Sequence, residues 1–318
     1  MPERRELGRS GLQVFPLCLG GNVFGWGADE AASHDVLDAY ADGGGNFIDS
    51  ANVYSAWVEG NSGGESEEII GRWLESRRDR DDMIVATKVG MAGAGLEEGL
   101  SRDQIRRGAE ESLQRLGTDR IDLYYAHQDD PATPLSETLA AFGELVDEGL
   151  VGSIAASNYS AERLAAALEI SGAEGLPRYE ALQPHYNLLE RDDYEGGPEQ
   201  VCRDQGLGVA PYFSLARGFL TGKYRPGQPT PDSPRARGVI ASFMNARGEA
   251  VLSALDAVSA AHDATPAQVS IAWLMQREGV TSPIASATTV AQVEDLLGAV
   301  AIDLTAEEFR ALDRAAVA

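Results

Sequence analysis

The sequence predicts an α/β protein, a (β/α)8 TIM barrel with an N-terminal β-hairpin and extra helices. Two observations support this fold class. First, eight short apolar runs alternate with stretches of helical periodicity, and this alternation is typical of a parallel sheet. Second, the eight units follow one another without a linker, as expected for a closed barrel. We therefore expect one barrel domain over residues 1–318.

The expected elements follow the chain in order. A hairpin is expected over residues 5–14, with Gly8-Arg9-Ser10-Gly11 as its turn. The apolar runs predict strands at 15–19, 47–48, 83–87, 121–125, 152–156, 179–182, 209–212 and 283–284. The stretches that follow predict helices at 31–40, 65–75, 102–116, 135–150, 161–169, 198–205, 249–261 and 290–300, with extra helices at 266–277 and 306–315. Residues 214–247 are expected to form a long irregular loop, and such loops are usually lids or binding loops.

Composition excludes several classes of protein. Hydrophobic residues make up 43% of the 318 residues, which is enough for a sizeable core. No apolar run is long enough to span a membrane, and the first residues lack a signal-peptide core, which predicts a cytoplasmic location. Cys18 and Cys202 are far apart and predict reduced thiols rather than a metal site. A net charge of -24 disfavours binding to nucleic acids and anionic membranes, and leaves the oligomeric state open.

Polar side chains follow six consecutive predicted strands. In a barrel of this kind the chemistry lies at the carboxyl ends of the strands. Each residue alone has an ordinary structural explanation, such as a solvated lysine or a turn-forming asparagine. Together they predict a functional site at one mouth of the barrel. In chain order they are Asp49, Lys88, His127, the pair Ser157-Asn158, Gln183 and Tyr212.

Asp49, Tyr54, Lys88 and His127 indicate proton transfer to a carbonyl oxygen. A phenol is a poor acid at neutral pH, and a neighbouring ammonium is expected to lower its pKa. The carboxylate would orient the lysine, and the imidazole could hydrogen-bond the substrate carbonyl. No side chain supplies a hydride, so a nicotinamide cofactor is implied. The segment Gly93–Gly99 has the wrong spacing for a dinucleotide-binding glycine motif, which disfavours a Rossmann domain, and no motif predicts a metal site.

These residues, at these spacings, make the chain resemble the aldo-keto reductase family over nearly its whole length. The resemblance implies a reductase of aldehydes or ketones, with Asp49, Tyr54, Lys88 and His127 as catalytic residues and Tyr54 as the proton donor. It also implies a cofactor site formed by Gly21, Asn22, Asp49, Ser157, Asn158, Gln183, Tyr212, Phe213, Ser214, Leu215, Arg217, Lys223, Ser286, Thr288, Gln292 and Asp295. The small-molecule carbonyl substrate is expected to contact Phe24, Trp26, Trp57, Met91, His127 and Gln128.

The chain departs from the family pattern in two places. Phe213-Ser214-Leu215 stands where many members have Ser-Pro-Leu. The segment 286–296, expected to meet the adenosine phosphate, has no basic residue, and Leu296 replaces an asparagine. We still expect NADP(H), with NAD(H) as the alternative. Two other functions stay open: an NAD-dependent sugar or polyol dehydrogenase, and a cofactor-sensing binding subunit without turnover. The complete set of four catalytic residues favours an enzyme.

Overall fold

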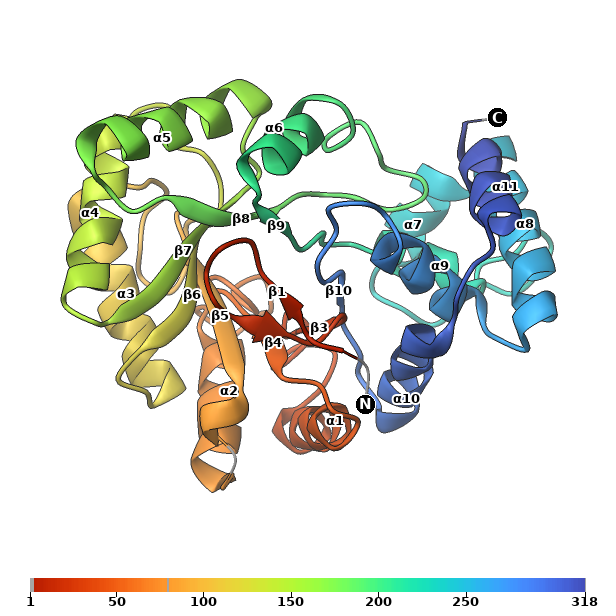
Figure 1. Cartoon of the computed structure of the whole chain (residues 1–318). Coiled ribbons are helices and arrows are strands. Elements are labelled where there is room, and N and C mark those ends of the chain that lie inside the picture. The colour runs from red at the N-terminus through yellow and green to blue at the C-terminus, as the bar shows by residue number, and fades with distance from the viewer. Residues whose placement is uncertain (1–2, 79, 318) are drawn as a thin grey trace.

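The computed structural model describes residues 3–78 and 80–317 and has eight parallel strands in the order β10-β3-β4-β5-β6-β7-β8-β9 (Figure 1). A bridge between Val209 and Val280, and a 2.8 Å hydrogen bond from Ile284 N to Pro211 O, join the two ends of this order. The predicted (β/α)8 architecture is therefore confirmed, while residues 1–2, 79 and 318 of the predicted domain lie outside the described residues. The strands are β3 Cys18–Gly20, β4 Phe47–Asp49, β5 Ile84–Val89, β6 Ile121–Ala126, β7 Val151–Ser157, β8 Tyr179–Gln183, β9 Gly208–Val209 and β10 Ile284–Ala285.

The helices surround these strands in Figure 1. Those that follow the strands are α1 Glu30–Asp42, α2 Glu65–Ser76, α3 Arg102–Leu116, α4 Leu135–Asp147, α5 Ala161–Glu174, α6 Gly197–Gln205, α8 Ala246–His262 and α10 Val290–Gly298. The predicted extra helices are α9 Pro266–Met275 and α11 Ala306–Ala316, each begun by a threonine in a capping box. Among the described residues, no helix combines the length and the apolar character that crossing a membrane requires.

Two predicted strands are shorter than expected. The strand expected at 209–212 ends as β9 at Val209, because Pro211 has no N–H group for the ladder. The strand expected at 15–19 begins only at Cys18. Ahead of it, Phe15 N donates to the side chain of Asn46 at 2.8 Å instead of to a neighbouring strand.

The long segment 214–247 is more regular than predicted. It contains a 3-10 segment at Ala216–Thr221 and the helix α7 Ala236–Phe243. The α7 side chains Val239 and Phe243 are buried, and the Phe243 ring lies 5.5 Å from that of Phe219. This eight-residue helix is stabilised by tertiary packing, which local propensity does not reveal.

The hairpin of β1 Arg5–Glu6 and β2 Gln13–Val14 covers the amino-terminal end of the barrel. Its Leu7 and Val14 side chains pack into the core formed by inward-facing strand residues such as Phe47 and Leu123. Gly8 adopts a positive φ of 62°, and a side chain there would collide with the backbone of Glu180. With this end covered, the opposite, carboxyl end is left for the site.

Candidate active site

Asp49, Lys88 and Tyr54 form one hydrogen-bonded cluster at the carboxyl ends of β4 and β5. The Lys88 ammonium donates to Asp49 Oδ2 at 2.6 Å, to the Tyr54 hydroxyl at 2.8 Å and to Ser50 O at 2.7 Å. Lys88 is fully buried and Asp49 is 2% exposed, so both charges are held away from bulk water. A buried ammonium with three acceptors has one fixed position, and here that position is beside the phenol.

The pKa values of the cluster differ from the sequence prediction in one respect. We expected Lys88 to lower the pKa of Tyr54. In the structure, burial and the negative charge of Asp49 raise the pKa of Tyr54 well above its ordinary value. Burial also lowers the pKa of Lys88, although Asp49 opposes this shift. Tyr54 therefore keeps its proton at neutral pH, as a proton donor must.

His127 follows β6 and faces the same place. Its ring lies 6.0 Å from the Tyr54 ring, centre to centre, in an edge-on arrangement. Burial, followed by the positive charge of Lys88, lowers the pKa of His127 well below its ordinary value, so the imidazole is neutral at pH 7. Its Nδ1 atom is buried without a hydrogen-bond partner among the described residues. A neutral imidazole in this position can donate one hydrogen bond to a carbonyl oxygen without transferring its proton.

The ends of β7 and β8 supply a second row of polar groups. Gln183 donates to Asp49 Oδ1 at 2.8 Å, and Ser157 donates to Gln183 O at 3.0 Å. Asn158 donates to His127 O at 2.9 Å and accepts a hydrogen bond from the Tyr212 hydroxyl at 2.8 Å. These bonds tie three of the predicted cofactor-binding residues to the cluster of Asp49, Lys88 and Tyr54 and place an aromatic ring beside them.

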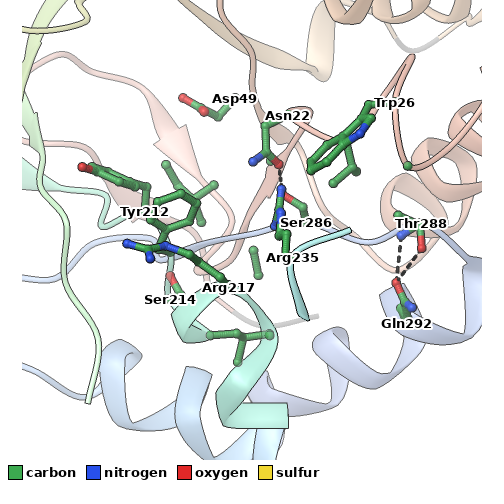
Figure 2. Close-up of a pocket in the computed structure, with 18 of the residues that line it drawn as sticks. Asn22, Trp26, Asp49, Tyr212, Ser214, Arg217, Arg235, Ser286, Thr288 and Gln292 are labelled. Atoms are coloured by element: carbon green, nitrogen blue, oxygen red, sulfur yellow. Dashed lines mark hydrogen bonds between the residues drawn. The ribbon is translucent and has the colours of Figure 1, made fainter. Parts of the chain in front are cut away.

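A cavity of about 770 Å³ joins this cluster to the loops of the carboxyl face. Figure 2 shows Tyr212 and Arg217 at one end of it and Thr288 and Gln292 at the other. Fifteen of the sixteen residues predicted to bind the cofactor line it; the exception is Gly21, where the neighbouring Gly20 lines it instead. Lys88 lies behind the cavity wall, because its ammonium is covered by Asp49 and Tyr54.

The structure brings four of the six predicted substrate residues to the cavity: Trp26, Trp57, Met91 and His127. The other two are corrections. Phe24 is fully buried in the core beside the barrel. Gln128 bonds to the Glu98 side chain and does not line the cavity. Trp57 is half exposed, and its ring contacts those of Trp26 and Tyr54 at 5.6 and 6.2 Å between centres, so it forms an apolar wall beside the phenol.

Three cations line the outer part of the cavity, and the sequence predicted only two of them. Arg217 and Lys223 were expected, whereas Arg235 was missed. The Arg235 guanidinium lies 4.8 Å from the centre of the Trp26 ring and has no carboxylate partner among the described residues. Burial and the charge of Arg217 lower the pKa of Arg235, and burial and the charge of Arg235 lower that of Lys223. Cations that repel one another on one wall form a site suited to a polyanion.

A signal for Arg235 was available in the sequence. It is a basic residue inside the long segment already expected to be a binding loop. The sequence does not predict, however, that residues 232–235 return to the cavity wall.

Comparisons with known proteins agree with this geometry. Residues 16–317 match the model of the aldo/keto reductase family. The chain is 34% identical to an uncharacterised oxidoreductase, YrpG, of Bacillus subtilis, over 98% of this chain and 95% of the relative. It is 32% identical to an aldo-keto reductase of Fusarium vanettenii, over 97% and 90%. It is also 32% identical to a probable voltage-gated potassium channel subunit beta of Arabidopsis thaliana, over 93% and 90%. The chain belongs to the aldo/keto reductase family.

Proposed function

We propose that this protein is an NADP(H)-dependent reductase that converts aldehydes or ketones to alcohols, within one domain that spans the chain. The observation that carries the proposal is the contact of the Lys88 ammonium with both Asp49 and the Tyr54 hydroxyl at the head of the cavity. This arrangement directs a protonated phenol toward the space where a carbonyl oxygen would bind. Family membership favours the same chemistry.

In the proposed reaction each residue of the cluster has one role. When bound, a nicotinamide supplies the hydride that reaches the carbonyl carbon. Tyr54 gives its proton to the carbonyl oxygen as negative charge develops there, and Lys88 stabilises the phenolate that is left. Asp49 keeps Lys88 charged and oriented by their 2.6 Å contact. His127 donates a hydrogen bond to the same oxygen and orients the carbonyl.

The residues that line the cavity fit a nicotinamide dinucleotide. Ser157, Asn158 and Gln183 offer donors and acceptors to a carboxamide, and Tyr212 offers an aromatic face to the ring. The cations Arg217, Lys223 and Arg235 suit the phosphates. Arg235 also strengthens the choice of NADP(H), because it gives the cavity a cation that segment 286–296 lacks.

The test is an absorbance assay at 340 nm with NADPH and NADH against a panel of aldehydes, ketones and sugars. We expect oxidation of NADPH with activated aldehydes, and a lower rate with NADH at equal concentration. Faster turnover with NADH would reject the cofactor choice. Turnover confined to oxidation of sugars or polyols with NAD⁺ would favour the dehydrogenase alternative.

A second candidate is a cofactor-binding subunit of an ion channel. The similarity to the Arabidopsis thaliana channel subunit favours this function. A pure sensor would bind NADPH and turn over activated aldehydes very slowly. Single-turnover measurements therefore separate the two functions, since an enzyme oxidises its bound NADPH rapidly once aldehyde is added. The cytoplasmic location stays a prediction from the sequence.

A further inference from the structure

The cavity wall contains a strained loop, residues 212–218, which we call the cofactor loop. Phe213, Ala216 and Arg217 have φ angles of 54°, 47° and 56°, although none of them is glycine. Left-handed backbone at three non-glycine residues costs free energy and persists only where the surroundings enforce it. Phe213 and Arg217 both line the cavity, so the strain lies in the wall itself.

A neighbouring segment, His185–Glu190, which we call the brace, holds this loop through Asn187 and Glu190. Asn187 is fully buried and donates to Phe213 O at 3.0 Å. Glu190 accepts from Arg217 at 3.4 Å and from Asn187 at 2.9 Å. The brace therefore bonds two of the three strained residues, Phe213 at its backbone carbonyl and Arg217 at its side chain.

The brace also supports Tyr212 from behind. The His185 ring stacks on the Tyr212 ring with centres 5.2 Å apart and planes 16° apart. His185 is held in turn by Glu190 at 2.7 Å. Tyr212 N donates to Pro184 O at 2.9 Å, just ahead of the brace. None of His185, Asn187 and Glu190 lines the cavity, so any effect they have on a ligand passes through the loop.

Glu190 is the residue that joins these contacts. Its carboxylate receives His185, Asn187 and Arg217 together. Burial alone would raise its pKa, but the hydrogen bonds from His185 and Asn187 bring the pKa below its ordinary value, so the group is ionised at neutral pH. One ionised carboxylate thus bonds the ring behind Tyr212, the amide on Phe213 and the guanidinium of Arg217.

We infer that Glu190 is a positioning residue that holds the cofactor loop in its binding shape before the cofactor arrives. This inference rests on the proposed function, since it concerns affinity for a nicotinamide dinucleotide. Preorganisation raises affinity because the cost of ordering the loop is met during folding. A loop released from the brace would have to be ordered again at each binding event.

The test measures Kd for NADP⁺ by quenching of tryptophan fluorescence in Glu190→Ala and Glu190→Gln. We expect Kd to rise about tenfold in Glu190→Ala, equivalent to about 1.4 kcal/mol. Glu190→Gln keeps a hydrogen-bond acceptor and should lose less. The rate at saturating NADPH should fall less than twofold, because the catalytic cluster is untouched. Tighter binding in either variant would show that Glu190 competes with phosphate for Arg217, and would overturn the inference.

Glu195→Ala is the matched control. Glu195 has nearly the same exposure as Glu190 and bonds Arg191, Arg277 and Tyr186, but none of the cofactor loop. This variant should lower the melting temperature and leave Kd unchanged. If Kd rose equally in Glu195→Ala and in Glu190→Ala, Glu190 would affect binding only through the general stability of the protein, and the inference would be overturned.

Hydrogen exchange of the cofactor-free protein gives a readout that needs neither turnover nor binding. Amides of Ala216 and Gly218 donate to Phe213 O at 2.7 Å and to Leu215 O at 2.9 Å. In Glu190→Ala the segment 212–220 should exchange faster than in the parent, and in Glu195→Ala it should not. Unchanged exchange in Glu190→Ala would overturn the inference. If the parent bound neither NADP⁺ nor NAD⁺, the proposed function would be rejected. The exchange measurement would still test whether Glu190 holds the cofactor loop in place.

Discussion

The two lysines of the chain belong to two regions around the same cavity, and these regions are built in different ways. Lys88 ends a strand, is fully buried and has three oxygen acceptors within 2.8 Å. Lys223 lies in a loop and is exposed, and its ammonium lies beside Gly218 and 5.4 Å from the centre of the Tyr224 ring. The first lysine is fixed by the fold, whereas the second is free to meet a ligand.

Under the proposed function, this difference separates the residues that carry out the chemistry from the residues that bind the cofactor. At the strand ends, neighbouring parallel strands in register hold Asp49, Lys88 and His127 in fixed relation, and proton transfer needs that precision. In the outer region, the loops supply cations, and one of them, Arg235, has no carboxylate partner among the described residues. Phosphate binding tolerates variation in the positions of such cations. Substitutions at the strand ends should therefore reduce rate, and substitutions in the outer region should reduce affinity.

Tyr54→Phe should give the largest effect. Removing the proposed acid while keeping the ring should lower the rate of reduction by about 10²–10⁴-fold, with little change in Kd for NADP⁺. Single-turnover kinetics measure the chemical step directly. Tyr212→Phe removes a hydroxyl that bonds Asn158 rather than the reacting centre, and should cost much less rate. A Tyr54→Phe rate above about one tenth of the parent would remove Tyr54 from the role of acid.

Conservative replacement of the two lysines compares the regions directly. Lys88→Arg should be nearly inactive, because a planar guanidinium does not fit a fully buried site built for a point charge. Lys223→Arg should be mild, since a phosphate accepts either cation. Steady-state rates with NADPH and an aldehyde would test both, with circular dichroism to check folding. Lys88→Met keeps the apolar stem and separates loss of charge from misfit. Equal losses at Lys88 and Lys223 would contradict the division into two regions.

The same division explains what the sequence predicted well. The alternating periodicity predicted the barrel. The barrel in turn predicted that the residues at the strand ends lie close together, because parallel register brings strand ends to one face. Their catalytic roles stay predictions. No comparable rule predicts where the side chains of loop residues lie. Phe24 packs into the core and Gln128 bonds to Glu98, although both were expected to contact the substrate. Arg235 lines the cavity, although the sequence did not predict it. The sequence also did not predict the raised pKa of Tyr54, because that shift depends on the burial of the phenol and on the charge of Asp49 beside it.

Arg235→Ala should weaken cofactor binding without a large effect on the chemical step. Loss of a charge-assisted hydrogen bond costs about 1.5–3 kcal/mol, so Kd for NADP⁺ should rise about tenfold or more. Isothermal titration with NADP⁺ and NAD⁺ at fixed ionic strength measures both constants. The loss should be greater for NADP⁺ if Arg235 meets the added phosphate. Arg237→Ala is the matched control, because Arg237 lies two residues further along, in α7, is exposed and does not line the cavity. An equal loss in both variants would mean that only net charge matters.

Thr288→Arg should have the smallest effect and should locate the extra phosphate. Thr288 lines the cavity, but its N and its hydroxyl both donate to Gln292, at 2.8 and 3.2 Å (Figure 2). Replacing a neutral hydrogen bond with a charge-assisted one gains about 1 kcal/mol, so affinity for NADP⁺ should rise about fivefold with that for NAD⁺ unchanged. Loss of the hydroxyl contact to Gln292 offsets part of this gain, whereas the backbone N–H contact stays.

The double variant Arg235→Ala/Thr288→Arg shows whether the two positions serve the same phosphate. If they do, the new arginine should restore most of the affinity for NADP⁺ that Arg235→Ala loses, because one cation replaces another at one anion. The gain from Thr288→Arg should then be larger without Arg235 than with it. Equal gains in both backgrounds would mean that the two residues act independently. No gain in either background would show that the phosphate lies away from segment 286–296, and would leave Arg235 as a contact of another phosphate.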